Sequence, residues 1–398
     1  MACEWQRRAC AGKGLDRREF LKSGTAAVVA AAIAPRLAAE ERQAEAPATL
    51  PRIVRVHDGR ATSWDYSSNY YFDYVDQAVV NHMLDLGVMA LTGAATAAAA
   101  WSSIFATYQP GDKVAVKINM NNYAGMSNQM DAIAPPINAL CRGLVDQLGI
   151  PAGNIYVYDC ARPIDYARVQ SRVTYPVVFV EDGDSLAQAD NNAPIYFRYI
   201  GTQYMPRVLT QAQHLINLPL MKDHFYVLAT MAFKHHLGTT RPGPSYLHPN
   251  IHYNLSDLSA NTHIRDKTRL ILADALFGLW DGGPYGEPMP WDTFPGGPTP
   301  NSFFLGFDPV AHESVMIDYL LAEQQYHGVS ETPHTYLHDA ASYNHLGVHE
   351  HRDANGRYSL IDYVQVDAQA PALVAGTPAA GGGSRARLFE RSGGLAQP

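Results

Sequence analysis

Cysteine is scarce in this sequence. Its 398 residues contain four cysteines, and two of them, Cys3 and Cys10, lie at the extreme N-terminus. No pair has the Cys-x-x-Cys spacing, so we expect neither a cysteine-ligated iron–sulfur cluster nor a cysteine-ligated structural zinc. Cys141 lies in a helical pattern and Cys160 at the end of a strand pattern, which favours two separate small core residues. A single disulfide between them is the alternative in an oxidising compartment.

A surplus of basic charge is also lacking. Lysine and arginine number 30 against 38 aspartates and glutamates, and the formal net charge is -8. This balance argues against a nucleic-acid partner, because nucleic-acid-binding proteins carry a basic face or stripe. No apolar run reaches the about 20 residues of a transmembrane helix, so stable membrane insertion is not expected. The sequence also contains no P-loop, no Gly-x-Gly-x-x-Gly after a strand and no Gly-x-Ser-x-Gly, which removes the common nucleotide-binding and hydrolase templates.

The first 48 residues have the pattern of a twin-arginine export signal. Arg17 and Arg18 stand in the run DRREFLK, and an Ala/Val-rich block over 24–34 follows. The block has the length of a signal-peptide core and is too short to span a bilayer. We therefore predict that residues 1–48 are cleaved within 34–48, that the Tat translocase is a transient partner, and that the protein is periplasmic or secreted. An amphipathic N-terminal helix of the fold is the alternative.

From residue 52 onward, strand patterns alternate with helical patterns. This order predicts an α/β fold with a mostly parallel central sheet flanked by helices, in one large domain over 52–370 and with one or two lobes. A flexible tail is expected over 371–398. The Pro/Gly-rich segment 280–300 is predicted to be a long loop that covers the ligand site. Predicted strands cover 52–57, 113–118, 154–159, 176–181, 194–200, 214–218, 269–273 and 302–305, and predicted helices cover 76–86, 94–105, 135–148, 225–234 and 309–323, the last capped by Asp308.

Lysines and histidines gather directly after the predicted strand 214–218. Open α/β sheets bind ligands at the carboxyl ends of their strands, so this position favours a functional site. His224 and Lys234 suit a general base and acid, or a metal ligand and an anion clamp. A solvent-facing helix is the alternative for the same residues. We predict four catalytic residues that converge on one pocket, namely Lys117, His224, Lys234 and His235.

Further polar residues follow the predicted strands and suit the binding of an anionic ligand. Arg241 has the geometry for a bidentate grip on a carboxylate or phosphate. Asp274 ends a buried strand and is a candidate carboxylate. The predicted ligand-binding residues are Asn119, Lys222, Arg241 and Asp274.

Histidine is abundant, with 16 residues, several of them at spacings that suit a metal. Two imidazoles four residues apart lie on one face of a helix. We predict that a transition metal, if one is bound, is held by His224, His248 and His252. The identity of any other cofactor stays unknown. A second group at 334, 338, 345, 349 and 351 has similar spacings, with a solvated surface cluster as its alternative.

Several short motifs occur in an order that resembles the domain-of-unknown-function 362 family. They are GDKVAVKIN over 111–119, LINLPLMKDH over 215–224, FKHHLG over 233–238, LADALFG over 272–278 and GFDPV over 306–310. The resemblance covers about 52–325 and implies an α/β fold. Many relatives carry cysteine-ligated clusters in an attached ferredoxin module, whose motifs this sequence lacks. A weaker similarity, by analogy only, is to the lactate racemase class, in which His and Lys hold a nickel-bearing nucleotide and move protons.

Together these features lead to one functional expectation with one alternative. We expect an exported, soluble, metal- or cofactor-assisted enzyme of oxidoreductase or isomerase type. Its substrate would be a small anionic, carboxylate-bearing molecule bound at the Lys/His site. The alternative is a non-catalytic periplasmic protein that binds a small ligand or a metal in the same pocket.

Overall fold

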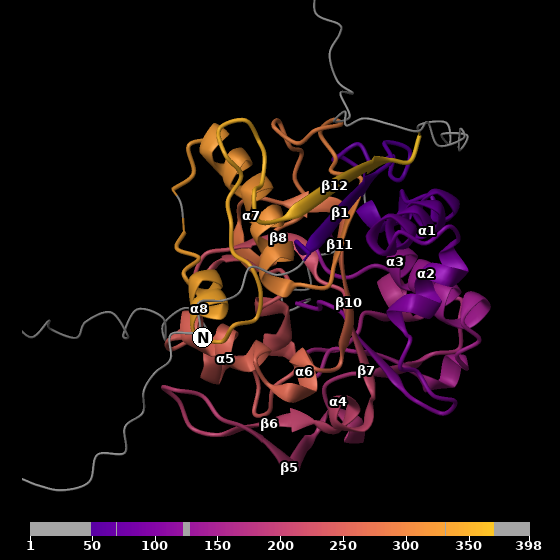
Figure 1. Cartoon of the computed structure of the whole chain (residues 1–398), viewed down its shortest axis with the longest axis vertical. Coiled ribbons are helices and arrows are strands. Elements are labelled where there is room, and N and C mark those ends of the chain that lie inside the picture. Colours follow the sequence, from indigo (N-terminus) through magenta and orange to yellow (C-terminus); the bar gives the residue numbers. More distant parts are fainter. Residues whose placement is uncertain (1–48, 69, 122–127, 331, 370–398) are drawn as a thin grey trace, which may run out of the picture. The chain divides into compact units, whose positions relative to one another are not determined.

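A computed structural model describes residues 49–68, 70–121, 128–330 and 332–369 (Figure 1). The described residues from Thr49 onward belong to one compact unit. The predicted export signal (1–48) and the predicted tail (371–398) lie outside the described residues.

A ten-stranded sheet organises this unit, in the order β12-β1-β11-β10-β7-β2-β3-β4, with β8 paired to β10 and β9 paired to β8. The strands β10, β7, β2, β3 and β4 run parallel, whereas β11 is antiparallel to both of its neighbours. The predicted mixed α/β fold with a mostly parallel sheet is confirmed. The strands are β1 (Arg52–His57), β2 (Val114–Lys117), β3 (Ile155–Tyr158), β4 (Val178–Val180), β7 (His214–Asn217), β8 (Leu220–His224), β9 (Leu228–Ala229), β10 (Thr268–Leu279), β11 (Ser302–Gly306) and β12 (Asp362–Asp367), and a separate pair is formed by β5 (Ala189–Ile195) and β6 (Gln203–Pro206).

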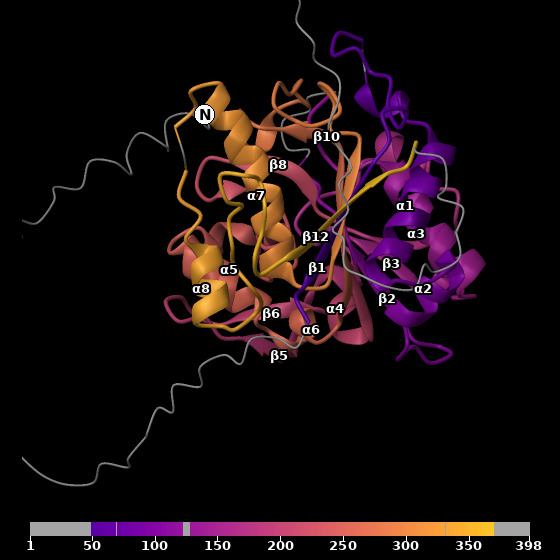
Figure 2. The same cartoon turned by 45° about the horizontal axis from the view of Figure 1, so that its top comes forward.

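Helices cover both faces of the sheet and bury a separate apolar core on each (Figure 2). Leu272 and Leu276 of β10 belong to the core under α1–α3, whereas Ala273 and Ala275 belong to the opposite core. A strand buried on both faces has no polar side, which explains its nearly continuous apolar run. The first face carries α1 (Gln77–Thr92), α2 (Ala97–Ile104) and α3 (Ala134–Cys141), and the second carries α4 (Arg207–Gln211), α5 (Ile251–Ser259), α6 (Thr262–Arg265), α7 (Pro309–Tyr326) and α8 (Tyr336–Ser342).

Local capping fixes the ends of the longest helices. The Asp76 carboxylate accepts hydrogen bonds from two backbone N–H groups in the first turn of α1, and Gly93 ends this helix with a φ of 74°. The Asp308 carboxylate caps α7 in the same way and Pro309 occupies the first turn, so the predicted capping role of Asp308 is confirmed. No single helix within the described ranges is long and apolar enough to cross a membrane; α1 and α2 pass a length and composition test only together, across a 59° bend.

The predicted helix over 225–234 is wrong. The chain turns back after His224, forms β9 against β8, and only then enters a short 3-10 helix, Lys234–Gly238. Thr230 N–H donates to Lys222 O at 2.7 Å, and the Asn217 side chain donates to Ala232 O at 2.9 Å. These partners satisfy the backbone from outside the segment, so tertiary pairing overrides the local helical pattern.

Other elements also differ from the sequence expectation; the predicted strand over 194–200, for example, ends at Ile195 as β5. Strand β8 was not predicted, because a lysine, an aspartate and a histidine occupy its last three positions. Strand β12 was not predicted either, and it pairs in parallel with β1 at the sheet edge. The predicted helix over 135–148 ends as an α-helix at Cys141 and continues as a π-helical stretch, Arg142–Gln147.

Candidate functional site

A polar pocket opens where β2, β3 and β8 end. Its volume is about 110 Å³, smaller than the roughly 300–1,000 Å³ of pockets for drug-sized ligands. Three of the four predicted catalytic residues line it, which brings them to the strand ends as expected. The lining residues are Asn119, Met120, Asn121, Asp159, Ala161, Arg162, His224, Thr230, Lys234, His235, Leu237, Gly238, Pro244, His248 and Tyr285.

Lys117 lies directly beneath this pocket rather than in its wall. Its side chain is fully buried, and Nζ donates to Ile118 O at 2.5 Å and to Asp159 Oδ2 at 3.0 Å. Asp159 also accepts hydrogen bonds from the backbone N–H groups of Met120 and Ala161. The charge of Lys117 is therefore compensated inside the protein, and this residue forms part of the pocket floor. Its catalytic role stays a prediction.

Gly238 closes tightly over this buried pair. A Cβ at position 238 would lie 2.8 Å from Asp159 Oδ1 and 2.9 Å from Lys117 Nζ. Such distances are shorter than any ordinary contact, so the backbone can approach the pair only because glycine has no side chain. The motif that ends at Gly238 therefore packs its backbone directly against the buried Lys117–Asp159 pair that forms the pocket floor.

The positive charge of Lys234 is not balanced by a carboxylate among the described residues. Its side chain is buried, and its Nζ has no hydrogen-bond or ion-pair partner among the described residues. Burial, and to a lesser extent the positive charges of Lys222 and Arg162, together lower the pKa of Lys234 to about 7. Lys234 can therefore gain or lose a proton near neutral pH, as a general acid or base must.

His235 lines the pocket, and one of its two ring nitrogens lacks a hydrogen-bond partner among the described residues. Its Nε2 lies 2.8 Å from Lys117 O, and because a carbonyl only accepts, Nε2 carries the proton. Nδ1 then holds a lone pair, is buried, and has no partner among the described residues. Burial, followed by the nearby Lys117 charge, holds the pKa of His235 well below its usual value, so this imidazole is neutral. Asn119 Oδ1 is a second buried acceptor of the pocket wall for which the described ranges supply no partner.

His224 and His248 stand next to each other with opposite tautomers. Tyr226 N–H donates to His224 Nδ1 at 3.1 Å, so His224 carries its proton on Nε2. His248 Nδ1 lies 3.0 Å from Pro244 O and must donate to it, which leaves a lone pair on Nε2. Their ring centroids are 6.5 Å apart. Burial and the charge of Lys234 lower the pKa of both imidazoles.

The balance of charge around the pocket is positive. Lys234 and Arg162 line the wall, and Asp159 is already paired with Lys117. A desolvated surplus of positive charge attracts an anion far more strongly than the same charges do in water. The pocket therefore suits a small anionic molecule.

Three predicted ligand-binding residues do not line this pocket. Lys222 lies two residues before the end of β8, where its Nζ donates to Met130 O and lies 3.8 Å from Asp131. Arg241 does grip a carboxylate, but the carboxylate is Asp182 of the protein itself, at 2.9 Å.

Asp274 lies on the face of β10 that also carries Leu272 and Leu276, and its Oδ1 accepts from the Leu276 N–H. Burial raises the pKa of Asp274 to about 7. Asn119 is the predicted ligand-binding residue that the structure does bring to the pocket.

The predicted metal ligands are not assembled as a set. His224 and His248 both line the pocket, but the ring of His252 packs against Tyr336 with centroids 6.3 Å apart. His252 lies in the first turn of α5. The helical spacing that would place its ring beside that of His248 does not apply, because α5 starts only at Ile251. Three imidazoles line the described part of the pocket. By these tautomers His235 and His248 each hold a lone pair that a metal could use, whereas His224 carries its proton on Nε2 and accepts a hydrogen bond at Nδ1.

The long Pro/Gly-rich loop borders the pocket with its first part. Tyr285 lines the pocket, and Gly283 N–H donates to Asp223 Oδ2 at 3.1 Å. The later part packs inward, because Trp291 and Phe294 are buried in the core. Contact with the pocket agrees with the predicted position of this loop, while its role as a cover stays a prediction.

Sequence reasoning missed Asp159 and Arg162 as pocket residues. Asp159 is the first residue after β3, in the same structural position as residues that the strand-end rule did select. Applying that rule to every predicted parallel strand would have found Asp159.

The fold and the pocket define an α/β protein with a small pocket, lined by Lys234 and Arg162, at the carboxyl ends of its parallel strands. Residues 114–318, which run from β2 into α7, match the family described as a domain of unknown function, DUF362. The chain belongs to this family. No curated protein matches the chain.

Proposed function

We propose that this protein is an enzyme that binds a small carboxylate-bearing molecule in the Lys/His pocket and moves a proton on it. The observation that carries the proposal is Lys234, a buried lysine without a counter-charge among the described residues and with a pKa lowered to about 7. A lysine of this kind exchanges a proton near neutral pH, and in its protonated form it attracts an anion.

The remaining pocket groups suggest how such a molecule would be held. Arg162 and Lys234 would neutralise the carboxylate. His224, with its proton on Nε2, would donate a hydrogen bond, and the bare acceptors His235 Nδ1 and Asn119 Oδ1 would receive one from a hydroxyl or amine of the ligand. The Lys117–Asp159 pair would fix the floor from which these groups project.

Assistance by a transition metal or an organic cofactor belongs to the same proposal. His235 and His248 are the pocket imidazoles whose tautomers leave a lone pair for it, and His224 would have to give up its hydrogen bond from Tyr226 to join them. The neighbouring charge of Lys234 lowers the affinity of this pocket for a cation, so the pocket favours an anion. Elemental analysis and mass spectrometry of protein purified from its native host would detect a stoichiometric metal or cofactor.

The alternative is a non-catalytic protein that binds the same kind of ligand. One observation favours it: the pKa values of His224, His235 and His248 are all lowered. These imidazoles stay neutral at physiological pH, and none supplies a second group tuned to exchange protons there.

Proton exchange in D₂O separates the two functions. The purified protein is incubated with a panel of small 2-hydroxy and 2-amino carboxylates, and loss of the proton next to the carboxylate is followed by ¹H NMR. An enzyme exchanges that proton, and Lys234→Ala abolishes the exchange whereas Lys113→Ala, at a half-exposed lysine before β2, does not. Binding detected by calorimetry without exchange would establish the alternative. The absence of both binding and exchange across small carboxylates would refute the proposal.

We also propose that the chain is exported through the twin-arginine pathway to the periplasm or the exterior. The support is the run DRREFLK with its following Ala/Val-rich block. Replacing Arg17 and Arg18 by lysine should trap the precursor in the cytoplasm, while the same change at Arg7 and Arg8 should not. Mature-length protein in the periplasmic fraction of the first variant would contradict export by this route.

A further inference from the structure

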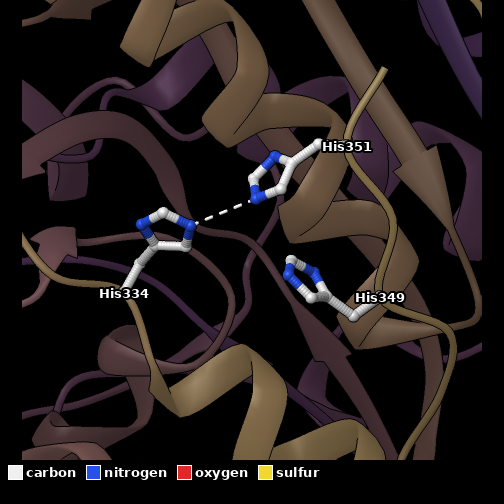
Figure 3. Close-up of side chains that lie close together, drawn as sticks. All are labelled: His334, His349 and His351. Atoms are coloured by element: carbon white, nitrogen blue, oxygen red, sulfur yellow. Dashed lines mark hydrogen bonds between the residues drawn. The ribbon is translucent and has the colours of Figure 1, made fainter. Parts of the chain in front are cut away.

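Histidines from the C-terminal part of the described chain converge beside α7 (Figure 3). His334 precedes α8, and His349 and His351 come from the segment that follows it. One ring nitrogen from each residue lies within 4.8 Å of the corresponding nitrogens of the other two. None of these residues lines the Lys/His pocket, so the cluster is a separate feature of the fold.

One ring nitrogen of His349, Nε2, has no hydrogen-bond partner among the described residues. The hydroxyl of Ser314 donates to Val310 O at 2.7 Å, which uses its single proton. Ser314 Oγ can therefore only accept from His349 Nδ1, 2.8 Å away. The proton of His349 sits on Nδ1, and the lone pair on Nε2 is buried without a partner among the described residues.

His351 is oriented by a carboxylate in the manner of a metal ligand. Its Nδ1 lies 2.5 Å from Asp318 Oδ1, so Nδ1 carries the proton and Nε2 the lone pair. Metal-binding histidines almost always donate their second nitrogen to a carboxylate, carbonyl or similar acceptor, which fixes the ring and raises its basicity. Ser314 and Asp318 lie four residues apart on α7, so one turn of this helix positions both imidazoles.

The spacing of the ring nitrogens matches a tetrahedral ion. Two nitrogens bound to Zn²⁺ at about 2.0–2.1 Å lie about 3.3–3.4 Å apart when the angle at the metal is tetrahedral. The Nε2 atoms of His334 and His351 are 3.2 Å apart. These two nitrogens are hydrogen-bonded to each other (Figure 3), and His334 Nε2 is the donor because His351 Nε2 holds a lone pair. A metal ion would replace that proton with almost no change in the distance between the two nitrogens.

We propose that His334, His349 and His351 form a binding site for one Zn²⁺-like transition-metal ion, coordinated through their three Nε2 atoms. Imidazole ligands without cysteine or carboxylate suit Zn²⁺ and its neighbours rather than Mg²⁺ or Ca²⁺. The ion would lie near the protein surface, because His351 is exposed. The side chains that orient the ligands, Ser314 and Asp318, complete the site.

A second group, Asp292, Glu323 and His327, also has ligand atoms close together. Its donors and acceptors are already matched within the protein. The Glu323 carboxylate accepts from the Asp292 and Thr293 N–H groups, and His327 Nε2 lies 3.0 Å from Glu323 and 3.1 Å from Asp292. These contacts make it a helix-end ion pair that needs no metal.

The three-histidine site would fasten the C-terminal segment to the body of the protein. Its ligands come from that segment, and Ser314 and Asp318 belong to α7. Glu313, the residue before Ser314 on α7, accepts hydrogen bonds from Tyr336 OH and from the N–H of Phe233, which is the residue before Lys234. A metal bound here would stabilise the junction between the C-terminal segment and the helix that supports the pocket, without touching the pocket ligand.

Zinc titration of the full chain tests the site. Protein treated with a chelator is titrated with Zn²⁺ by calorimetry, and Co²⁺ is added separately to record the absorption of a tetrahedral ion. We expect one equivalent of metal, which His349→Ala and His351→Ala each abolish. Ser314→Ala, which removes only the hydroxyl that orients His349, should weaken binding about 10- to 100-fold. His345→Asn, at an exposed histidine of the same segment with a φ of 51°, is the matched control and should bind normally.

The double variant His224→Ala/His248→Ala distinguishes this site from the pocket. Retention of the zinc equivalent in this variant is expected. Loss of the equivalent there, or unchanged zinc binding in His349→Ala, would overturn the proposal, as would a wild-type chain that takes up no zinc. Far-UV circular dichroism of the metal-free variants shows whether the loss of binding reflects the loss of a ligand or of the fold. None of these outcomes depends on enzymatic activity, so the site can fail or stand independently of the function proposed for the pocket.

Discussion

Replacing Lys234 by methionine should stabilise the protein at neutral pH while it removes the function of the pocket. The pKa of Lys234 is lowered from 10.5 to about 7, first by burial. Each pKa unit corresponds to about 1.36 kcal/mol, so holding this lysine protonated in the folded state costs about 5 kcal/mol. Because half of the folded molecules are already neutral at pH 7, the cost at that pH is about 4 kcal/mol.

The sign of the pH dependence follows from proton binding in the two states. Between pH 7 and 10.5 the unfolded state holds more protons at this lysine than the folded state does, so wild-type stability rises with pH over that window. Below pH 7 both states are protonated and the penalty is constant. The free energy of unfolding of Lys234→Met should therefore exceed that of wild type by about 4 kcal/mol at pH 7 and by about 2 kcal/mol at pH 9.

Urea unfolding at pH 6, 7, 8 and 9 measures this difference, with Lys113→Met as the control for loss of a half-exposed lysine. The variant should at the same time lose binding of small carboxylates. If wild type is the more stable protein at pH 7, or if the difference does not change with pH, Lys234 has a partner that compensates its charge, and the reasoning behind the proposed site is refuted.

Three further perturbations test the pocket floor and the sheet behind it. Asp159→Asn leaves Lys117 buried without a counter-charge and should lower the free energy of unfolding by about 3–5 kcal/mol in urea titrations; a loss below 1 kcal/mol would mean that the pair is not desolvated. Gly238→Ala should cost about 1–3 kcal/mol and abolish carboxylate binding, because its Cβ has no room, whereas Gly201→Ala, with open space around it, should be neutral in both assays. Burial raises the pKa of Asp274 to about 7, so the folded protein loses stability as the pH rises from 4 to 7. The free energy of unfolding of Asp274→Asn should therefore exceed that of wild type by about 4 kcal/mol above pH 7, and by almost nothing near pH 4. A difference that does not change with pH would contradict this.

Local sequence accounts for those elements whose signals are self-contained. Asp308 followed by Pro309 starts α7 where the sequence predicted it, because capping depends on a side chain and the next three N–H groups. The apolar run of β10 is recognisable because a strand buried on both faces needs no alternation. Strand β8 gives no such signal, since its polar residues are buried only through neighbours that come from elsewhere in the chain.

The residues of the candidate site likewise divide into those that local sequence predicts and those that it does not. The strand-end rule found Asn119, because the ends of parallel strands meet at one edge of the sheet. His224, Lys234 and His235 reach the same pocket by another route, since His224 ends the unpredicted strand β8 and the other two lie in the 3-10 helix Lys234–Gly238. The same rule placed Lys117 only approximately, since whether a strand-end lysine enters the pocket or pairs beneath it depends on Asp159, from another strand.

The sequence by itself determined the α/β order of elements, the strand ends that carry the pocket, and the residue types available there. Tertiary structure alone decided which of these residues are compensated. Arg241 is matched to Asp182 and Lys117 to Asp159, whereas Lys234 has no such partner among the described residues. The physical reason is that the pKa and the charge state of a side chain depend on distances and on desolvation, which are set by segments far away in the chain and are not written in local sequence.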